Sequence, residues 1–155
     1  MSLRDRITDE MKTALKAGDK TRLSTLRLIS AAVKDRDIAA RAEDRCAGCE
    51  DAEIMAILQK LVKQREESAE TYEKAGRLDL AEAERGEAEI VREFLPKPMD
   101  STEIEHAAQT VVSELDASGL KDMGRVMGEL KTRYAGRMDF GKAGAKVKTL
   151  LAGAA

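Results

Sequence analysis

A chain of 155 residues, 43% of them apolar, has enough apolar side chains for a packed core, which excludes global disorder and allows one domain or two small ones. Aromatic residues make up only 3%, the net charge is −2, and Ala, Leu, Glu, Lys and Arg dominate, a composition that favours helices. No apolar run approaches the roughly 20 residues that span a bilayer and no apolar signal segment follows Met1, so we expect a cytoplasmic protein with no membrane partner.

Apolar residues at helical spacing predict four helices in the first 95 residues. These helices span about residues 2–17, 20–42, 51–75 and 79–94. Gly18 and Gly76 are natural stops for the first and the third helix, and Asp19 offers an N-cap for the second. The residues expected to face the core in the first helix are Leu3, Ile7, Met11, Ala14 and Leu15; in the second they are Leu23, Leu26, Ile29 or Ser30, and Val33, with Ile38 at the end of the stripe. In the third helix they are Ile54, Leu58, Leu61, Ala69 and Tyr72, and in the fourth they are Leu80, Ala83, Ile90 and Phe94.

The segment Leu95-Pro-Lys-Pro-Met99 interrupts the helical pattern. Two prolines separated by one residue make a stiff joint, because proline fixes its own backbone and pushes the preceding residue toward extended geometry. We therefore predict an N-terminal domain over residues 1–95, a proline linker over 96–99 and a C-terminal domain over 100–155.

Three further helices are predicted after the linker, over about residues 100–116, 120–134 and 140–151. Asp100 and Glu103 form a capping box at the start of the first, and Asp139 is the expected N-cap of the last. No stretch alternates in the manner of a strand. The predicted fold class is all-α: an N-terminal bundle of about four helices and a C-terminal three-helix domain.

Charge is distributed unevenly along the chain. Residues 1–49 carry a net charge of +3, residues 50–95 one of −6, and residues 96–155 one of +1, with an excess of +5 after Ala117. A basic helical module at the end of an acidic chain is a candidate for binding an anion. The candidate nucleic-acid-binding residues are Lys121, Arg125, Lys131, Arg133, Arg137, Lys142 and Lys146, and a second candidate surface comprises Lys20, Arg22, Arg27 and Lys34.

Two glycines four residues apart, Gly124 and Gly128, fall inside the predicted sixth helix. Glycine within a helix costs about 1 kcal/mol relative to alanine. We therefore expect another backbone to pass close to that face.

Residues that could carry catalysis or bind a metal are few. Cys46 and Cys49 have the spacing of half a zinc site, but no second cysteine pair follows; an incidental loop pair, a metal shared across an oligomer and a redox role remain open. His106 has no nucleophile beside it and is expected to be a helix-surface or boundary residue. The glutamate-rich run at residues 82–93 is expected to be a solvated helix face. We predict no catalytic residue, no metal ligand and no cofactor.

Five segments carry a resemblance to a known family: Asp19-Lys-Thr-Arg-Leu-Ser-Thr-Leu-Arg-Leu-Ile-Ser-Ala-Ala-Val-Lys34, Leu61-Val-Lys-Gln-Arg-Glu-Glu-Ser68, Tyr72-Glu-Lys-Ala-Gly-Arg-Leu-Asp-Leu80, Glu93-Phe-Leu-Pro-Lys-Pro98 and Lys121-Asp-Met-Gly-Arg-Val-Met127. In this order and spacing the chain resembles the YqeY-like branch of the GatB/YqeY family. The resemblance implies two helical domains, the second similar to the GatB tail of the tRNA-dependent amidotransferase. That tail recognises tRNA, while a separate and larger domain performs the amide transfer. The pair Cys46 and Cys49 departs from the family pattern, so no inherited role attaches to it.

Together these observations favour an accessory protein that binds tRNA or another structured RNA, with an aminoacyl-tRNA-related protein as a further partner. Aromatic side chains for stacking on unpaired bases are nearly absent, so contacts to phosphates and to RNA shape are expected. The alternative is a protein-interaction module without RNA binding. A glutamine-dependent amidotransferase (carbon–nitrogen ligase) activity would follow only from the family association, and we expect no catalysis by this chain alone.

Overall fold

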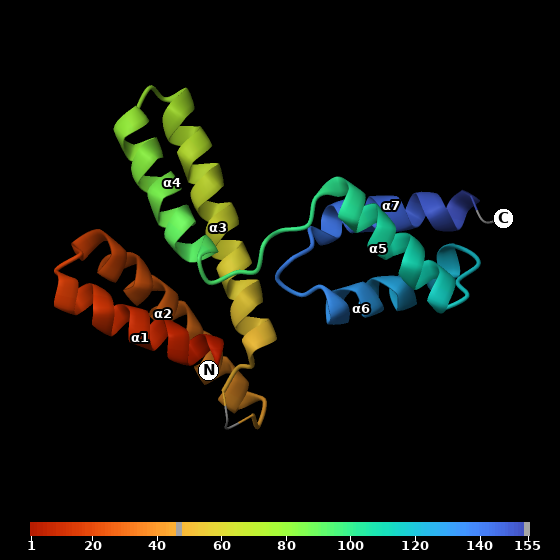
Figure 1. The fold of residues 1–155 in the computed structure, drawn as a ribbon, viewed down its shortest axis with the longest axis horizontal. Coiled ribbons are helices and arrows are strands. Elements are labelled where there is room, and N and C mark those ends of the chain that lie inside the picture. Colours follow the sequence, from red (N-terminus) through yellow and green to blue (C-terminus); the bar gives the residue numbers. More distant parts are fainter. Residues whose placement is uncertain (46–47, 154–155) are drawn as a thin grey trace. The chain divides into compact units, whose positions relative to one another are not determined.

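The computed structural model describes residues 1–45 and 48–153, and in them the chain is helical without a strand, which confirms the all-α prediction (Figure 1). The elements are α1 (Leu3–Ala17), α2 (Lys20–Ala42), α3 (Asp51–Lys74), α4 (Leu78–Arg92), α5 (Ser101–Glu114), the 3-10 helix η1 (Leu120–Asp122), α6 (Met123–Arg133) and α7 (Phe140–Gly153). These helices form two compact units, Met1–Pro96 and Lys97–Ala155.

The first unit consists of two helical hairpins, α1 with α2 and α3 with α4 (Figure 1). Ser2 and Asp19 cap α1 and α2 by accepting hydrogen bonds from backbone N–H groups in the first turn, as their residue types favour. The core of this unit is built from side chains of all four helices, with Leu26, Leu58 and Val91 almost fully buried. The ends of the helices are therefore fixed locally, and the hairpins are joined by apolar burial.

Two residues of α1 and α2 that were expected in the core are exposed instead. Leu15 is 61% exposed and Ile38 is 64% exposed. Leu15 follows the buried Ala14, and one residue step turns a helix by about 100°, which carries Leu15 out of the interface. Ile38 lies five residues after the buried Val33, about 140° further round α2.

The buried face of α4 differs by one residue from the predicted one. Ala83 is exposed and Leu80 is half-buried, whereas Ala81 and Ala88 have no exposed surface. Alanine at the contact lets α4 pack closely against α3, so the small residues occupy the interface.

The second unit packs α5, α6 and α7 around a separate core. Ile104, Val126, Leu130 and Val147 are almost fully buried at its centre. The predicted sixth helix is divided in the structure, because residues 120–122 form a 3-10 turn and the α-helix begins at Met123.

The expectation of close backbone packing at Gly124 and Gly128 is wrong. Both glycines are exposed, and a Cβ atom placed on either would meet no atom within 4 Å outside its own helix and its chain neighbours. The glycine near the helix contact is Gly144 of α7, whose Cβ position lies 3.9 Å from the terminal methyl groups of Met123 and Met127.

Replacing Gly128 with alanine should raise the thermal midpoint of the second unit. The site is open and helical, so alanine should add about 0.5–1 kcal/mol to the free energy of unfolding. Circular dichroism melting of both proteins measures the change. Gly136→Ala provides the control with the opposite sign, since Gly136 has φ +80°, where a Cβ atom is strained. A lower midpoint for Gly128→Ala would contradict the open site.

Candidate nucleic-acid interface

The seven candidate nucleic-acid-binding residues of the second unit lie on η1, α6, α7 and the connection between α6 and α7. Six of them are exposed and Lys146 is half-buried. The structure places them as follows: Lys121 on η1, Arg125, Lys131 and Arg133 on α6, Arg137 in the connection, and Lys142 and Lys146 on α7.

Three of these seven cations are engaged by groups of the same unit. Arg133 pairs with Glu114 of α5 at 2.6 Å and with Glu129 at 2.8 Å, and hydrogen bonds to both carboxylates raise the pKa of its guanidinium. Lys146 lies 3.7 Å from Glu105 of α5. The Arg133 and Lys146 pairs join α6 and α7 to α5, so a structural role accounts for both cations.

Arg125 is the third engaged cation. Its Nη2 donates to the carbonyl oxygen of Leu115 at 2.8 Å and lies 3.6 Å from Asp122. This contact holds the segment that connects α5 to α6 against the side of α6. Arg125 is therefore a less available contact for phosphate than its exposure alone indicates.

The four remaining candidates, together with Lys148, form what we call the open cationic set: Lys121, Lys131, Arg137, Lys142 and Lys148. All five are exposed, and within residues 1–45 and 48–153 none has a carboxylate oxygen within 4.0 Å. Lys148 was not among the predicted site residues, although it contributes to the charge excess after Ala117. The set can therefore meet external anions without breaking an ion pair.

The second candidate surface is also divided by its contacts. Arg22 of α2 pairs with Glu10 of α1 at 2.8 Å and with Glu93, directly after α4, at 2.7 Å. Both pairs raise the pKa of the Arg22 guanidinium, and they link α2 to α1 and to the end of α4. Lys20, Arg27 and Lys34 are exposed at intervals of seven residues along α2. A shallow hollow of about 390 Å³ on this helix is lined by Lys20, Leu23, Ser24, Arg27 and Leu28.

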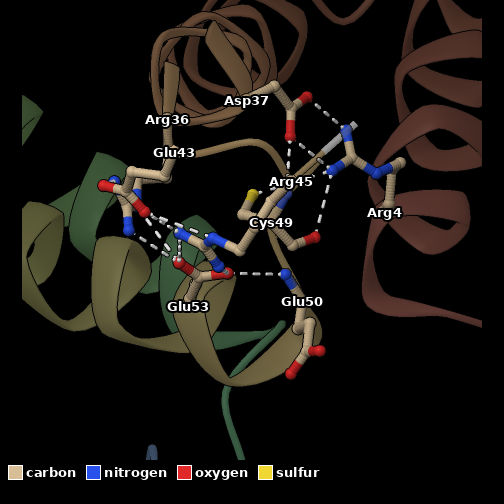
Figure 2. Close-up of polar contacts among 8 residues, drawn as sticks. All are labelled: Arg4, Arg36, Asp37, Glu43, Arg45, Cys49, Glu50 and Glu53. Atoms are coloured by element: carbon tan, nitrogen blue, oxygen red, sulfur yellow. Dashed lines mark hydrogen bonds and ion pairs between the residues drawn. The ribbon is translucent and has the colours of Figure 1, made fainter. Parts of the chain in front are cut away.

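A polar cluster missed by the sequence analysis secures the end of the loop between α2 and α3 (Figure 2). Arg4 of α1 donates to both carboxylate oxygens of Asp37 at 2.7 and 2.8 Å, and Asp37 also accepts the Cys49 N–H at 2.9 Å. The Arg4 guanidinium holds the pKa of Asp37 well below its usual range. The three groups come from distant parts of the chain, so no local motif could have indicated them.

Cys49 belongs to this cluster and is 7% exposed. Its Sγ lies 3.6 Å from Arg4 Nη2, and burial raises the pKa of the thiol. A raised pKa lowers the thiolate fraction that redox and metal chemistry require. Cys46, the other member of the predicted pair, lies outside the described residues.

A second group of charged side chains, Arg36, Glu43, Arg45 and Glu53, lies next to this cluster (Figure 2). Glu53 of α3 accepts hydrogen bonds from Arg45 and Arg36 at 2.8–3.0 Å, and these contacts, with the backbone N–H of Glu50, hold its pKa at about 2. Glu43 bridges the same two arginines. The arrangement is a closed ion-pair network, in which both of its carboxylates, Glu43 and Glu53, are held by arginines.

The other candidates of the sequence have ordinary surroundings. His106 is exposed on α5. In the glutamate-rich run, Glu87 pairs with Arg65, Glu89 with Arg92, and Glu93 with Arg22, so that run is partly a set of ion pairs. No group of three potential metal ligands occurs within the described part of the chain. Nor does any of its helices combine the length and apolarity needed to cross a membrane.

Comparison with known proteins gives a match to one family model over residues 4–151, described as Yqey-like protein. Three curated relatives are called altered inheritance of mitochondria protein 41, mitochondrial. The protein of Lachancea thermotolerans is 31% identical over 111 residues, which cover 70% of this chain and 57% of the relative. That of Clavispora lusitaniae is 30% identical over 70% of this chain and 62% of the relative, and that of Pyrenophora tritici-repentis is 24% identical over 85% and 71%. The aligned regions thus cover less than two thirds of the length of the Lachancea thermotolerans and Clavispora lusitaniae proteins.

Proposed function

This chain belongs to the YqeY-like protein family, and from that premise we propose that its C-terminal unit binds structured RNA, tRNA in the first place. The observation that carries the proposal is the open cationic set. Five exposed cations without a carboxylate partner in the described structure lie on η1, α6, α7 and their connection. Cations in this state can release counterions from RNA phosphates without first losing an internal ion pair.

The contacts we propose are to phosphates and to the shape of folded RNA. Tyr134 and Phe140, the aromatic residues near the cations, are half-buried against the core of the unit. Rings packed against the core in this way offer little stacking surface to unpaired bases. A set of exposed cations without such a platform suits the phosphate backbone of a folded RNA better than a single strand.

The role that fits this surface is accessory. The resemblance of the C-terminal unit to the GatB tail of the tRNA-dependent amidotransferase supports tRNA as the ligand and an aminoacyl-tRNA-related protein as a second partner. We propose that this chain positions RNA and that any amide transfer resides in another protein. The sequence favours the cytoplasm as the compartment, while the relatives are named for mitochondria; tRNA is present in both.

Replacing Lys131, Arg137 and Lys142 together with alanine should weaken binding of folded tRNA and flatten its salt dependence. Three lost phosphate contacts should reduce the slope of log affinity against log salt by roughly two to three. Fluorescence anisotropy with labelled tRNA across a salt series measures both quantities. The matched control is Lys12→Ala/Lys16→Ala/Lys63→Ala, which removes three exposed lysines of the first unit.

The comparison of the two triple variants decides the proposal. Equal losses would indicate attraction by overall charge alone, and absence of binding at low salt with an intact helical spectrum would reject RNA as the ligand. Arg133 is left unchanged in the test, because its removal would also release Glu114 and Glu129.

A further inference from the structure

A groove of about 610 Å³ runs along the α3–α4 hairpin of the first unit. Its lining comes from α3, apart from one residue of α4: Gln64, Arg65, Glu67, Ser68, Thr71, Tyr72 and Glu84. Gln64 and Ser68 belong to one of the segments that carry the family resemblance, and Tyr72 opens the next. The proposed RNA function gives these residues no role.

The groove begins where the apolar core of the first unit ends. Leu58 and Leu61 of α3 pack in that core, together with Val91 of α4. From Gln64 onward, one side of α3 carries neutral hydrogen-bonding side chains at i, i+4 and i+7, namely Gln64, Ser68 and Thr71. In Figure 1 the α3–α4 hairpin extends away from the α1–α2 hairpin. Gln64 and Thr71 are exposed and Ser68 is half-buried, so this side of α3 is open to solvent. The polar track is about 10 Å long, the length of two turns of helix.

The positive charge in the groove is already neutralised. The Arg65 side chain is 15% exposed, its Nε lies 3.3 Å from Glu87, and that Nε is buried without a hydrogen bond. Glu67 and Glu84 remain, one from each helix, and neither has a cationic partner in the described structure. The groove therefore presents two uncompensated carboxylates beside a polar track.

We infer that this groove receives a positively charged α-helix of a partner protein, whose lysine or arginine side chains pair with Glu67 and Glu84. Charge complementarity selects this occupant: residues 50–95 carry 13 acidic and 7 basic side chains, which disfavours RNA and attracts cations. Gln64, Ser68 and Thr71 would meet the polar side chains of the incoming helix, and the Tyr72 ring would cover the aliphatic stem of one of its basic residues. The inference concerns other residues than the RNA proposal, so either can fail alone.

The test uses the full chain and a defined probe. The probe is a fluorescein-labelled, alanine-based helical peptide of about 20 residues with lysine at every fourth position, a length that covers the hairpin. Anisotropy titrations at moderate salt should show saturable binding, and Glu67→Gln/Glu84→Gln should weaken it at least tenfold, roughly the effect of losing two charge pairs. The same variant should bind tRNA as the unmodified chain does.

A matched control separates the groove from general acidity. Glu70→Gln/Glu82→Gln removes the same charge from the same two helices outside the groove, and should change peptide affinity less than twofold, the range expected of exposed charges. Equal losses in the two double variants, or no saturable binding to the unmodified chain, would overturn the inference.

Sedimentation velocity of the chain alone tests whether a second copy of this chain occupies the groove instead of a partner helix. A monomer at the concentrations used for the titration supports a separate partner. If the chain dimerises and Glu67→Gln/Glu84→Gln abolishes the dimer, a second copy fills the groove and the partner-helix inference is overturned.

Discussion

Replacing Asp37 with asparagine should lower the free energy of unfolding of the first unit by about 2 kcal/mol. The Asp37 side chain is 17% exposed and accepts three hydrogen bonds, two from Arg4 and one from the Cys49 N–H. An amide in its place retains one acceptor, leaves the Arg4 guanidinium without its counter-charge and disturbs the N-terminal side of α3. Hydrogen bonds to charged groups are among the stronger ones in proteins, so the effect exceeds that of an average surface substitution.

The same substitution should reduce the acid sensitivity of the protein. The folded-state pKa of Asp37 is depressed, so its contribution to stability is fully present above the unfolded-state value near 4 and is lost progressively as the pH falls from there through the lower folded-state pKa. Urea unfolding at pH 7 and pH 3 therefore should show a smaller difference for Asp37→Asn than for the unmodified chain. Asp35→Asn, at an exposed position of the same helix, is the control and should change neither quantity measurably. Equal stability of Asp37→Asn and the unmodified chain at pH 7 would contradict a role for the cluster.

Local signals along the sequence predicted the helices well because the physics that sets helix ends is local. Ser2, Asp19 and Asp100 cap helices in the structure as their residue types favour. Asp139 likewise accepts backbone N–H groups at the start of α7. A cap needs one side chain and the next three residues, all of which the sequence displays together.

Contacts between distant residues could not be predicted in the same way. Arg4 and Asp37 are 33 residues apart, and nothing in either segment distinguishes this pair from other arginines and aspartates. The buried face of α4 was missed for a related reason. The predicted stripe is shifted by one residue from the observed one, and the contact with α3, which the sequence does not display, accompanies the burial of Ala81 and Ala88.

The same limit applies to the candidate RNA surface. Counting charges after Ala117 located a positive region. A count, however, does not distinguish a cation that is paired with a carboxylate of the same unit from a cation without such a partner. Arg133 and Lys146 are held by glutamates of α5, while Lys148 is open and was not selected. The structure therefore changes which residues a binding experiment should replace, although the choice of ligand still depends on the family resemblance.

Replacing Leu130 with alanine should have the largest effect of the changes considered, because it removes a large side chain from the centre of a small core. Leu130 has no exposed surface and packs in the cluster that contains Ile104, Val126 and Val147. A leucine-to-alanine change at such a site costs about 3 kcal/mol, from lost burial and the cavity left behind. A core of this size supplies only about 3–5 kcal/mol in total. The second unit should therefore be close to its unfolding midpoint at room temperature.

Hydrogen exchange measured by mass spectrometry can test this unit by unit. Amides of α5, α6 and α7 should lose most of their protection in Leu130→Ala, while those of α1 to α4 should keep theirs, because the two cores share no residue. Leu120→Ala is the matched control, since Leu120 is 54% exposed and its truncation should cost less than about 0.5 kcal/mol. Loss of protection in both units would show that the cores unfold together. If the second unit alone unfolds, tRNA binding should disappear with it, because the open cationic set is held in place only by this fold.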